Sequence, residues 1–148
     1  LVLGSFPGAA SLRAQQYYGH PQNAFWKILG VLWGLPLPAA PYEQRVQALL
    51  DHGLGVWDVY ASCEREGSLD AAIRHAEVND LAGILRTSPT LQGIAHNGGE
   101  SFKHARHTRA LGVPVHRLPS TSPANAGWSF ERKLAAWADV LRRHGVCA

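Results

Sequence analysis

The chain opens with residues 1–8, LVLGSFPG, a short apolar run followed by glycine, serine and proline. An apolar run of this length is typical of a strand that is buried on both faces of a sheet. The two glycines and the proline predict that the backbone turns tightly directly after the strand. The segment therefore predicts a buried strand followed by a loop whose backbone can approach a ligand closely.

Similar apolar runs recur along the chain and alternate with segments of helical periodicity. The expected strands are residues 1–4, 54–60, 91–95 and 113–118. The expected helices are residues 24–33, 42–52, 100–111 and 130–143, with a short helix between Asn79 and Ser88. Residues 61–76 are polar, and we expect them to be rich in loops. Strands separated by helices predict an α/β fold, a three-layer α/β/α sandwich around a mostly parallel four-stranded sheet.

Composition is ordinary for a globular protein, with 148 residues, 46% hydrophobic and 17% charged. This length suits a single domain spanning residues 1–148. No apolar run reaches the 18 or more residues that a membrane span needs, so a membrane protein is excluded. The sequence contains no Met, and we expect that residues preceding Leu1 are missing.

The chain has two cysteines, Cys63 and Cys147, too few for a disulfide framework, a four-Cys zinc site or an iron–sulfur cluster. We expect reduced thiols in a monomeric, cytoplasmic protein. His104 and His107 have no carboxylate or Cys partner at a recognised metal-ligand spacing. We therefore expect no metal site.

Charge is unevenly distributed between the two parts of the chain. Residues 1–95 hold six Lys and Arg against eight Asp and Glu, whereas residues 96–148 hold eight against three. The positive C-terminal part is what a polyanion-binding face would produce, although an ordinary solvated surface would give the same pattern.

Ligands of open α/β sheets bind at the carboxyl ends of the strands, which directs attention to residues 5–23, 61–68, 96–100 and 119–129. The first loop lacks the Gly-Lys-Ser/Thr ending of a phosphate-binding loop and instead carries aromatics and amides. Asn23 in this loop has two open interpretations, a functional amide or a helix N-cap. Tyr17 and Tyr18 are likewise either site residues or packing residues.

The last loop, residues 119–129, is rich in hydroxyl side chains, which suit contacts to phosphate oxygens. An ordinary turn before the last helix is the alternative. A nucleophilic serine is disfavoured, because the G-x-S-x-G pattern is absent and no base is paired to any serine.

Four ordered motifs in these loops resemble the uracil-DNA glycosylase superfamily. They are GSFPG at residues 4–8, QYYGHPQNAFW at 16–26, WDVYASCEREGSLD at 57–70 and LPSTSPA at 118–124. Together they most resemble the hypoxanthine-DNA (deoxyinosine) glycosylase branch, which is related to the mismatch-specific uracil-DNA glycosylases. The resemblance extends over essentially the whole chain.

The resemblance implies a monofunctional DNA glycosylase of base excision repair that acts on double-stranded DNA containing a deaminated base. Such enzymes flip the base out of the duplex and hydrolyse its N-glycosidic bond, with no metal or cofactor. The branch implies hypoxanthine as the base. A uracil-directed enzyme and a noncatalytic binding module on the same fold stay open as alternatives.

The first motif departs from better-known members at Phe6, where relatives place an Asp or Asn that orients or deprotonates the attacking water. In the hypoxanthine branch the catalytic part passes to the asparagine of the second motif, which is Asn23 here. An amide is not a strong base, so Asn23 is expected to position water. General-base catalysis contributes about 10²–10⁴ in rate, and its absence predicts a slow enzyme.

The resemblance also implies a base pocket. Tyr18 matches the aromatic on which the flipped base stacks, and Asp58 matches a position where relatives carry a base-reading or catalytic side chain. Asp58 would accept from N1–H of hypoxanthine, and Asn97 or a backbone N–H would donate to O6, although a buried structural carboxylate is the alternative for Asp58. Ser5 and Phe6 complete the expected pocket.

DNA contacts are expected from the last motif and from a basic helix. In the position of the bulky wedge of relatives the chain has Pro123, Ala124 and Asn125, which predicts a small wedge and easier flipping of mispaired bases. The expected DNA-binding residues are Ser120, Thr121, Ser122, Ala124, Asn125, Lys103 and Arg106.

Overall fold

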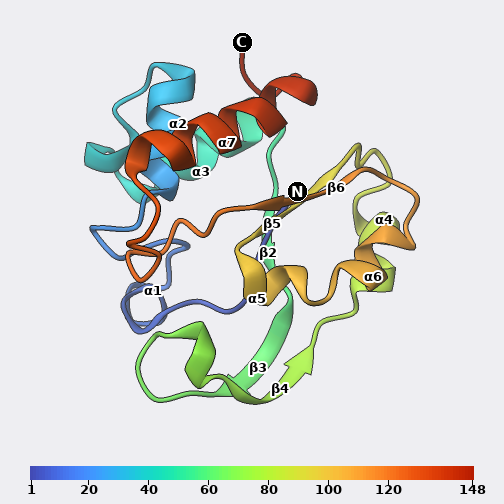
Figure 1. The fold of residues 1–148 in the computed structure, drawn as a ribbon. Helices are drawn as coiled ribbons and strands as arrows, with labels where there is room; N and C mark the ends of the chain where they lie inside the picture. Colours follow the sequence, from blue (N-terminus) through green and yellow to red (C-terminus); the bar gives the residue numbers. More distant parts are fainter.

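The computed structural model describes all of residues 1–148 (Figure 1). In chain order its elements, with 3-10 helices labelled η, are β1 (Val2–Gly4), α1 (Ala9–Ala14), α2 (Phe25–Trp33), η1 (Leu37–Ala39), α3 (Tyr42–Asp51), β2 (Val56–Asp58), β3 (Tyr60–Glu64), η2 (Asp70–Ala72), β4 (Arg74–Val78), η3 (Leu81–Gly83), α4 (Ile84–Thr87), β5 (Ile94–Asn97), α5 (Gly99–Phe102), α6 (Ala105–Arg109), β6 (Val115–Leu118) and α7 (Phe130–Arg143). No helix combines the length and the apolar character needed to cross a membrane.

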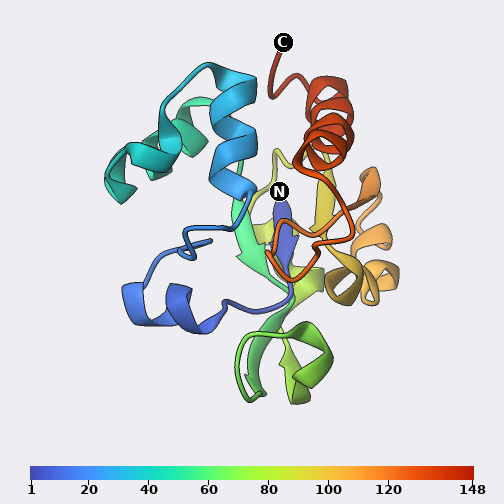
Figure 2. The ribbon, with the colours of Figure 1, turned by 60° about the vertical axis from the view of Figure 1, so that its left-hand side comes forward.

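The central sheet has four parallel strands in the order β2-β1-β5-β6, and helices lie on both of its sides (Figures 1 and 2). This confirms the expected α/β/α sandwich. Gly4 pairs in register with Asp58, and Asn97 pairs with Leu118. The last residues of all four strands therefore lie along one edge of the sheet.

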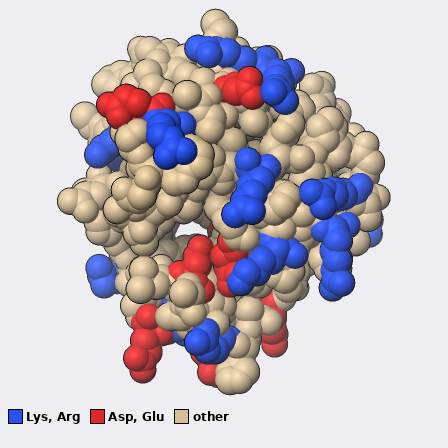
Figure 3. Space-filling model, viewed as in Figure 1, with Lys and Arg blue, Asp and Glu red and all other residues tan.

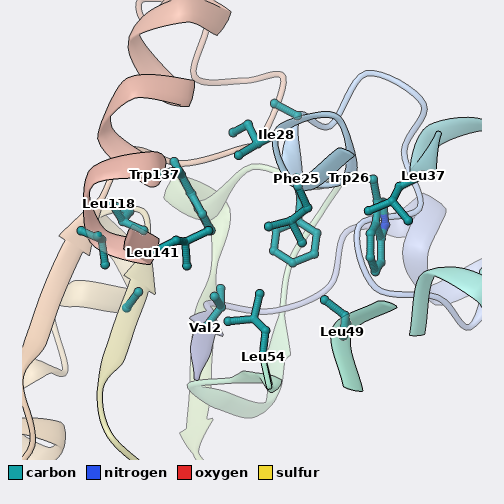
Figure 4. Close-up of a cluster of buried hydrophobic side chains, with 14 of the residues drawn as sticks. Val2, Phe25, Trp26, Ile28, Leu37, Leu49, Leu54, Leu118, Trp137 and Leu141 are labelled. Atoms are coloured by element: carbon teal, nitrogen blue, oxygen red, sulfur yellow. The ribbon is translucent and has the colours of Figure 1, made fainter. Parts of the chain in front are cut away.

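Alternation along β1 explains why the sheet is covered on both faces. Val2 and Leu3 point to opposite faces and are both fully buried. Val2 belongs to the larger core, where α2, α3 and α7 pack on the sheet, and Figure 4 shows Phe25 and Trp137 above Val2 and Leu54. The Phe25 and Trp137 rings meet edge to face with centroids 5.9 Å apart. The apolar stripe of α7 predicted from the sequence is thus a core face.

Leu3 belongs to a second core on the opposite face of the sheet. Its other fully packed members include Val59, Ile84 and Ile94, which come from the segment after β2, from α4 and from β5. The short helix expected between Asn79 and Ser88 is confirmed as η3 and α4. It begins where the Asp80 carboxylate accepts the backbone N–H of Gly83 at 3.1 Å.

Two expectations about secondary structure are wrong in part. Residues 100–111 form two short helices, α5 and α6, with a break at His104, whose ring lies 3.0 Å from the Tyr60 hydroxyl. Residues 61–76 are not mainly loop, because β3 and β4 pair there as an antiparallel hairpin. Most of the hairpin's side chains are exposed, so its sequence lacks the alternation that identifies a strand with one buried face.

Candidate active site

A cavity of about 670 Å³ lies at the carboxyl edge of the sheet. The final residues of the four central strands contribute to it, as do the loops at residues 5–23 and 119–129 and the segment at 68–71. In the space-filling view a hollow lies near the middle of the face, with acidic atoms at its edge and basic side chains to its right (Figure 3). The cavity therefore lies where ligands of open α/β sheets bind, at the carboxyl ends of the strands.

The cavity contains eleven of the residues that the sequence singled out. They are Ser5, Phe6, Tyr18, Asn23, Asp58, Asn97, Ser120, Thr121, Ser122, Ala124 and Asn125. Segments up to about 120 residues apart are thus brought together as the four motifs predicted.

The Tyr18 side chain is held from two sides. Its ring stacks on Phe25 with centroids 4.1 Å apart, and its hydroxyl oxygen accepts from Asn97 Nδ2 at 3.2 Å. The backbone of Tyr18 is in the left-handed region, with φ of 53°, which is uncommon for an aromatic residue. One aromatic ring is therefore fixed against the cavity wall.

Asp58 ends β2 and is only 9% exposed. Burial raises the pKa of its carboxyl from 3.8 to about 6, and a hydrogen bond from the Tyr17 hydroxyl partly opposes this rise. The same carboxylate contributes, after burial, to a raised pKa of Tyr17. Asp58 is thus a cavity carboxylate that changes charge close to neutral pH.

Asn97 ends β5 and joins two walls of the cavity. Its Nδ2 donates to the Tyr18 hydroxyl and to Thr121 Oγ1 at 3.0 Å, and its Oδ1 accepts the backbone N–H of Thr121 at 3.0 Å. Both amide hydrogens are committed, so of the two expected donors to O6 the backbone N–H is the available one. Thr121 is 1% exposed and its side chain is bonded to Asn97, and its expected contact to DNA stays a prediction.

Asn23 lies at the cavity, just before the start of α2. Its Oδ1 accepts the backbone N–H of Phe25, the first residue of α2, at 2.9 Å, although the N-cap position itself is Ala24. The side chain is half-buried and lines the cavity, and its Nδ2 has no hydrogen-bond partner within the protein. A carbonyl oxygen has two lone pairs, so the bond from Phe25 leaves Oδ1 with one to offer a water.

Ser120 and Ser122 lie in the loop between β6 and α7 and stabilise it locally. Ser120 Oγ accepts the N–H of Ser122 and Ser122 Oγ accepts the N–H of Ala124, both at 3.2 Å. Asn125 Nδ2 donates to the carbonyl of Ser120 at 3.1 Å. Since both serines act as acceptors here, their hydroxyl hydrogens are available to donate to phosphate oxygens.

The two basic residues singled out by the sequence, Lys103 and Arg106, lie outside the cavity and are exposed. Lys103 forms an ion pair with Glu100 at 2.6 Å. Arg117 is another basic side chain of the positively charged part of the chain, residues 96–148, and it lines the cavity. Its guanidinium lies 5.6 Å from the Phe102 ring centroid.

Asp70 and Trp128 also line the cavity and were not among the predicted site residues. Asp70 lies at the start of η2 and accepts from Ser5 Oγ at 2.6 Å. Trp128 is 36% exposed, and the guanidinium of Arg132 lies 4.1 Å from its ring centroid. The signal for Asp70 was its place at the end of the third motif, and the signal for Trp128 was an aromatic in a loop of small residues.

Comparisons with known proteins identify relatives of this chain. No protein-family model matches the chain. It is 37% identical to the hypoxanthine DNA glycosylase of Methanosarcina barkeri over 97% of this chain and 90% of that protein. It is 38% identical to the hypoxanthine DNA glycosylase of Methanosarcina acetivorans over 96% of this chain and 89% of that protein.

A solved structure gives the same answer for the fold. The solution NMR structure of a protein assigned as a uracil DNA glycosylase from Methanosarcina acetivorans superposes with a TM-score of 0.85 and 37% identity. The match covers 96% of this chain and 88% of the other. With identities of this size over nearly all of each protein, this chain belongs to the hypoxanthine DNA glycosylase family.

Proposed function

We propose that this protein is a monofunctional DNA glycosylase that removes hypoxanthine from deoxyinosine in double-stranded DNA. The observation that carries the proposal is the meeting of four separate motifs in one cavity that holds a fixed aromatic ring and a buried carboxylate. The family relationship supports the choice of base. The uracil DNA glycosylase assignment of the structural neighbour makes uracil the second candidate.

The flipped base stacks on Tyr18. Phe25 covers one face of the Tyr18 ring, and Tyr18 itself lines the cavity, so the remaining face is offered to a base. Stacking of this kind is worth about 1–3 kcal/mol and hardly distinguishes one base from another. The ring therefore supplies affinity, and selectivity must come from the edge of the base.

Asp58 reads that edge. Hypoxanthine has a donor at N1–H and an acceptor at O6, and an ionised Asp58 accepts from N1–H. With a pKa of about 6, the carboxylate is mostly ionised at neutral pH. A backbone N–H at the cavity wall donates to O6, because the Asn97 amide hydrogens are already used.

Hydrolysis requires an oriented water and stabilisation of a positively charged sugar. Asn23 Oδ1 has a free lone pair at the cavity for the water, and the phosphates of the bound strand lie next to the developing charge. Ser120 and Ser122 hold those phosphates by donating their hydroxyl hydrogens. Ala124 and Asn125 lie on the same loop, and exposed Lys103 and Arg106 add attraction to the backbone.

The decisive experiment incubates the protein with duplexes containing deoxyinosine, deoxyuridine or deoxyxanthosine and cleaves abasic sites with alkali. We expect strand cleavage to be fastest at deoxyinosine. Faster cleavage at deoxyuridine would favour the uracil enzyme, and no cleavage at any lesion would refute the enzyme and leave the noncatalytic module.

Asn23→Ala tests the assignment of the water-positioning residue. We expect turnover to fall by about 100-fold or more, as for the loss of one preorganised hydrogen-bonding group, with DNA affinity retained. Gln22→Ala is the matched control, because Gln22 is exposed and lies outside the cavity. An Asn23→Ala variant that cleaves at the parent rate would contradict the assignment.

We propose further that the protein works as a monomer in the cytoplasm and needs no metal or cofactor. The chemistry above uses water, amide, hydroxyl and carboxylate groups only. Cleavage that disappears with EDTA and returns with a divalent cation would contradict the cofactor statement, and a dimer in size-exclusion chromatography would contradict the monomer.

A further inference from the structure

Ser5 and Asp70 form a short hydrogen bond at the cavity. Ser5 Oγ donates to Asp70 Oδ1 at 2.6 Å, a distance typical of a hydroxyl bound to an ionised carboxylate. Ser5 is 7% exposed, and both residues line the cavity although they are 65 positions apart in sequence. The bond therefore brings a carboxylate from the hairpin region to the end of β1.

This bond fixes what Ser5 can offer a ligand. A serine hydroxyl has one hydrogen and two lone pairs. Because the hydrogen is directed to Asp70, Ser5 Oγ faces the cavity as an acceptor, with Asp70 ready behind it to take up the hydroxyl proton. A water bound to Ser5 would therefore have a route by which to lose a proton.

The site needs such a route. Phe6 stands where relatives are expected to carry the Asp or Asn that serves the water, and the amide of Asn23 is not a strong base. Ser5 directly precedes Phe6 in the same loop. Through its bond to Ser5, the Asp70 carboxylate lies next to the first motif. It contacts the residue directly before position 6, where relatives are expected to carry the Asp or Asn.

We propose that Asp70 accepts the proton of the attacking water through Ser5. The C1′–N9 bond breaks and its electron pair leaves with the base. The water oxygen then bonds to C1′, its proton passes to Ser5 Oγ, and the hydroxyl proton of Ser5 passes to Asp70. Ser5 is the catalytic residue and Asp70 the positioning residue behind it. The inference rests on the proposed glycosylase function and deepens it.

The surroundings of Asp70 favour this role. Burial is the main cause that raises the pKa of Asp70, and the nearby charge of Glu100 raises it further. The hydrogen bond from Ser5 and the charges of Arg65 and Lys103 act in the opposite direction, and Tyr60 lies close enough to respond to Asp70. A raised pKa makes the carboxylate a better proton acceptor near neutral pH.

The test measures single-turnover cleavage of a deoxyinosine duplex as a function of pH. The parent rate is expected to rise with pH as Asp70 ionises and then to level off. Asp70→Asn is expected to lower the plateau by about 10²–10⁴ and to remove the part of the rise that Asp70 causes, while the part that comes from ionisation of the base-reading Asp58 stays and binding to the duplex is retained. Glu66→Gln is the matched control, because Glu66 is exposed, lies near Asp70 in sequence and does not line the cavity.

A double-mutant cycle separates the relay from a structural role. Ser5→Ala alone is expected to cause the same loss and the same change in the pH profile. The combination with Asp70→Asn is expected to be no slower than either single variant, because residues that act as a unit are not additive. Ser5→Ala also keeps the proposal testable if Asp70→Asn does not fold.

Several outcomes overturn the relay while leaving the glycosylase function intact. These are an Asp70→Asn variant that cleaves at the parent rate, additive losses in the cycle, or a Ser5→Ala variant that keeps the parent profile. An Asp58→Asn variant that abolishes the rise with pH while Asp70→Asn retains it would assign the proton to Asp58 instead. A parent protein that cleaves no lesion would overturn both the function and the relay.

Discussion

Asp58→Asn is expected to stabilise the protein at neutral and alkaline pH. The Asp58 carboxyl is buried, and its pKa is raised from 3.8 to about 6, mainly by burial. The folded state therefore binds the proton more tightly than the unfolded chain does. The stability that this proton contributes is fully present below about pH 4 and is lost as the pH rises through 6.

The size of the effect follows from the shift. Each pKa unit corresponds to about 1.4 kcal/mol of difference between the two protonation states, so a shift of about two units corresponds to about 3 kcal/mol. A typical domain unfolds with about 5–15 kcal/mol, so the effect is large enough to measure. Asparagine has nearly the same shape and no charge, so at pH 8 the variant should be more stable by up to this amount.

The assay is urea unfolding of the parent and the variant at pH 3.5 and pH 8. His96 requires that the two proteins be compared with each other at each pH. Burial lowers the pKa of His96 from 6.5 to about 4, so its contribution to stability is lost as the pH falls through this range. The parent curve mixes the opposite effects of Asp58 and His96, whereas the difference between variant and parent isolates Asp58.

We expect this difference to be near zero at pH 3.5 and to grow towards about 3 kcal/mol at pH 8. A difference that does not change with pH, or a variant that is less stable at pH 8, would refute the reasoning. Asp139→Asn serves as a control, since Asp139 is exposed on α7 and pairs only with Arg143 one turn away.

Four further predictions concern the activity of Asp58→Asn and three other substitutions. Asp58→Asn should change the ratio of cleavage rates on deoxyinosine and deoxyuridine. An ionised carboxylate only accepts hydrogen bonds from the base edge, whereas the amide of asparagine both donates and accepts. Trp128→Ala should weaken binding to a lesion duplex by about tenfold in an equilibrium titration, since a stacking aromatic is worth about 1–3 kcal/mol. Arg106→Ala should reduce the slope of log affinity against log salt by about one. Gly98→Ala should destabilise the fold by about 1–3 kcal/mol in urea, because its φ is 97° and a Cβ would lie 3.0 Å from Ser120 Cβ.

The sheet and the cavity could be predicted because their signals are local. Apolar strands such as β1 are followed by glycine or polar turns, and α7 carries its apolar side chains at helical spacing. The parallel order then brings the strand ends together without further information. Ser5, Asp58 and Asn97 could therefore be placed at one edge of the sheet from sequence alone.

The hairpin and its consequences could not be predicted in this way. β3 and β4 are stabilised by pairing with each other, and few of their side chains are buried, so no periodic apolar pattern marks them. Asp70 gains its importance from a bond to a residue 65 positions away, which no local pattern reveals. The sequence likewise does not reveal that both amide hydrogens of Asn97 are used, because their acceptors, Tyr18 and Thr121, lie far from Asn97 along the chain.

Under the proposed function, the bonds of Asn97 couple the expected contact with the DNA strand to the expected contact with the base. One amide holds both the Tyr18 hydroxyl and the Thr121 segment of the loop at residues 119–129. A phosphate that displaces this loop must either move the tyrosine with it or break a buried hydrogen bond. An undamaged duplex that presses on the loop in the wrong register would therefore disfavour the base-accepting arrangement before any base leaves the helix.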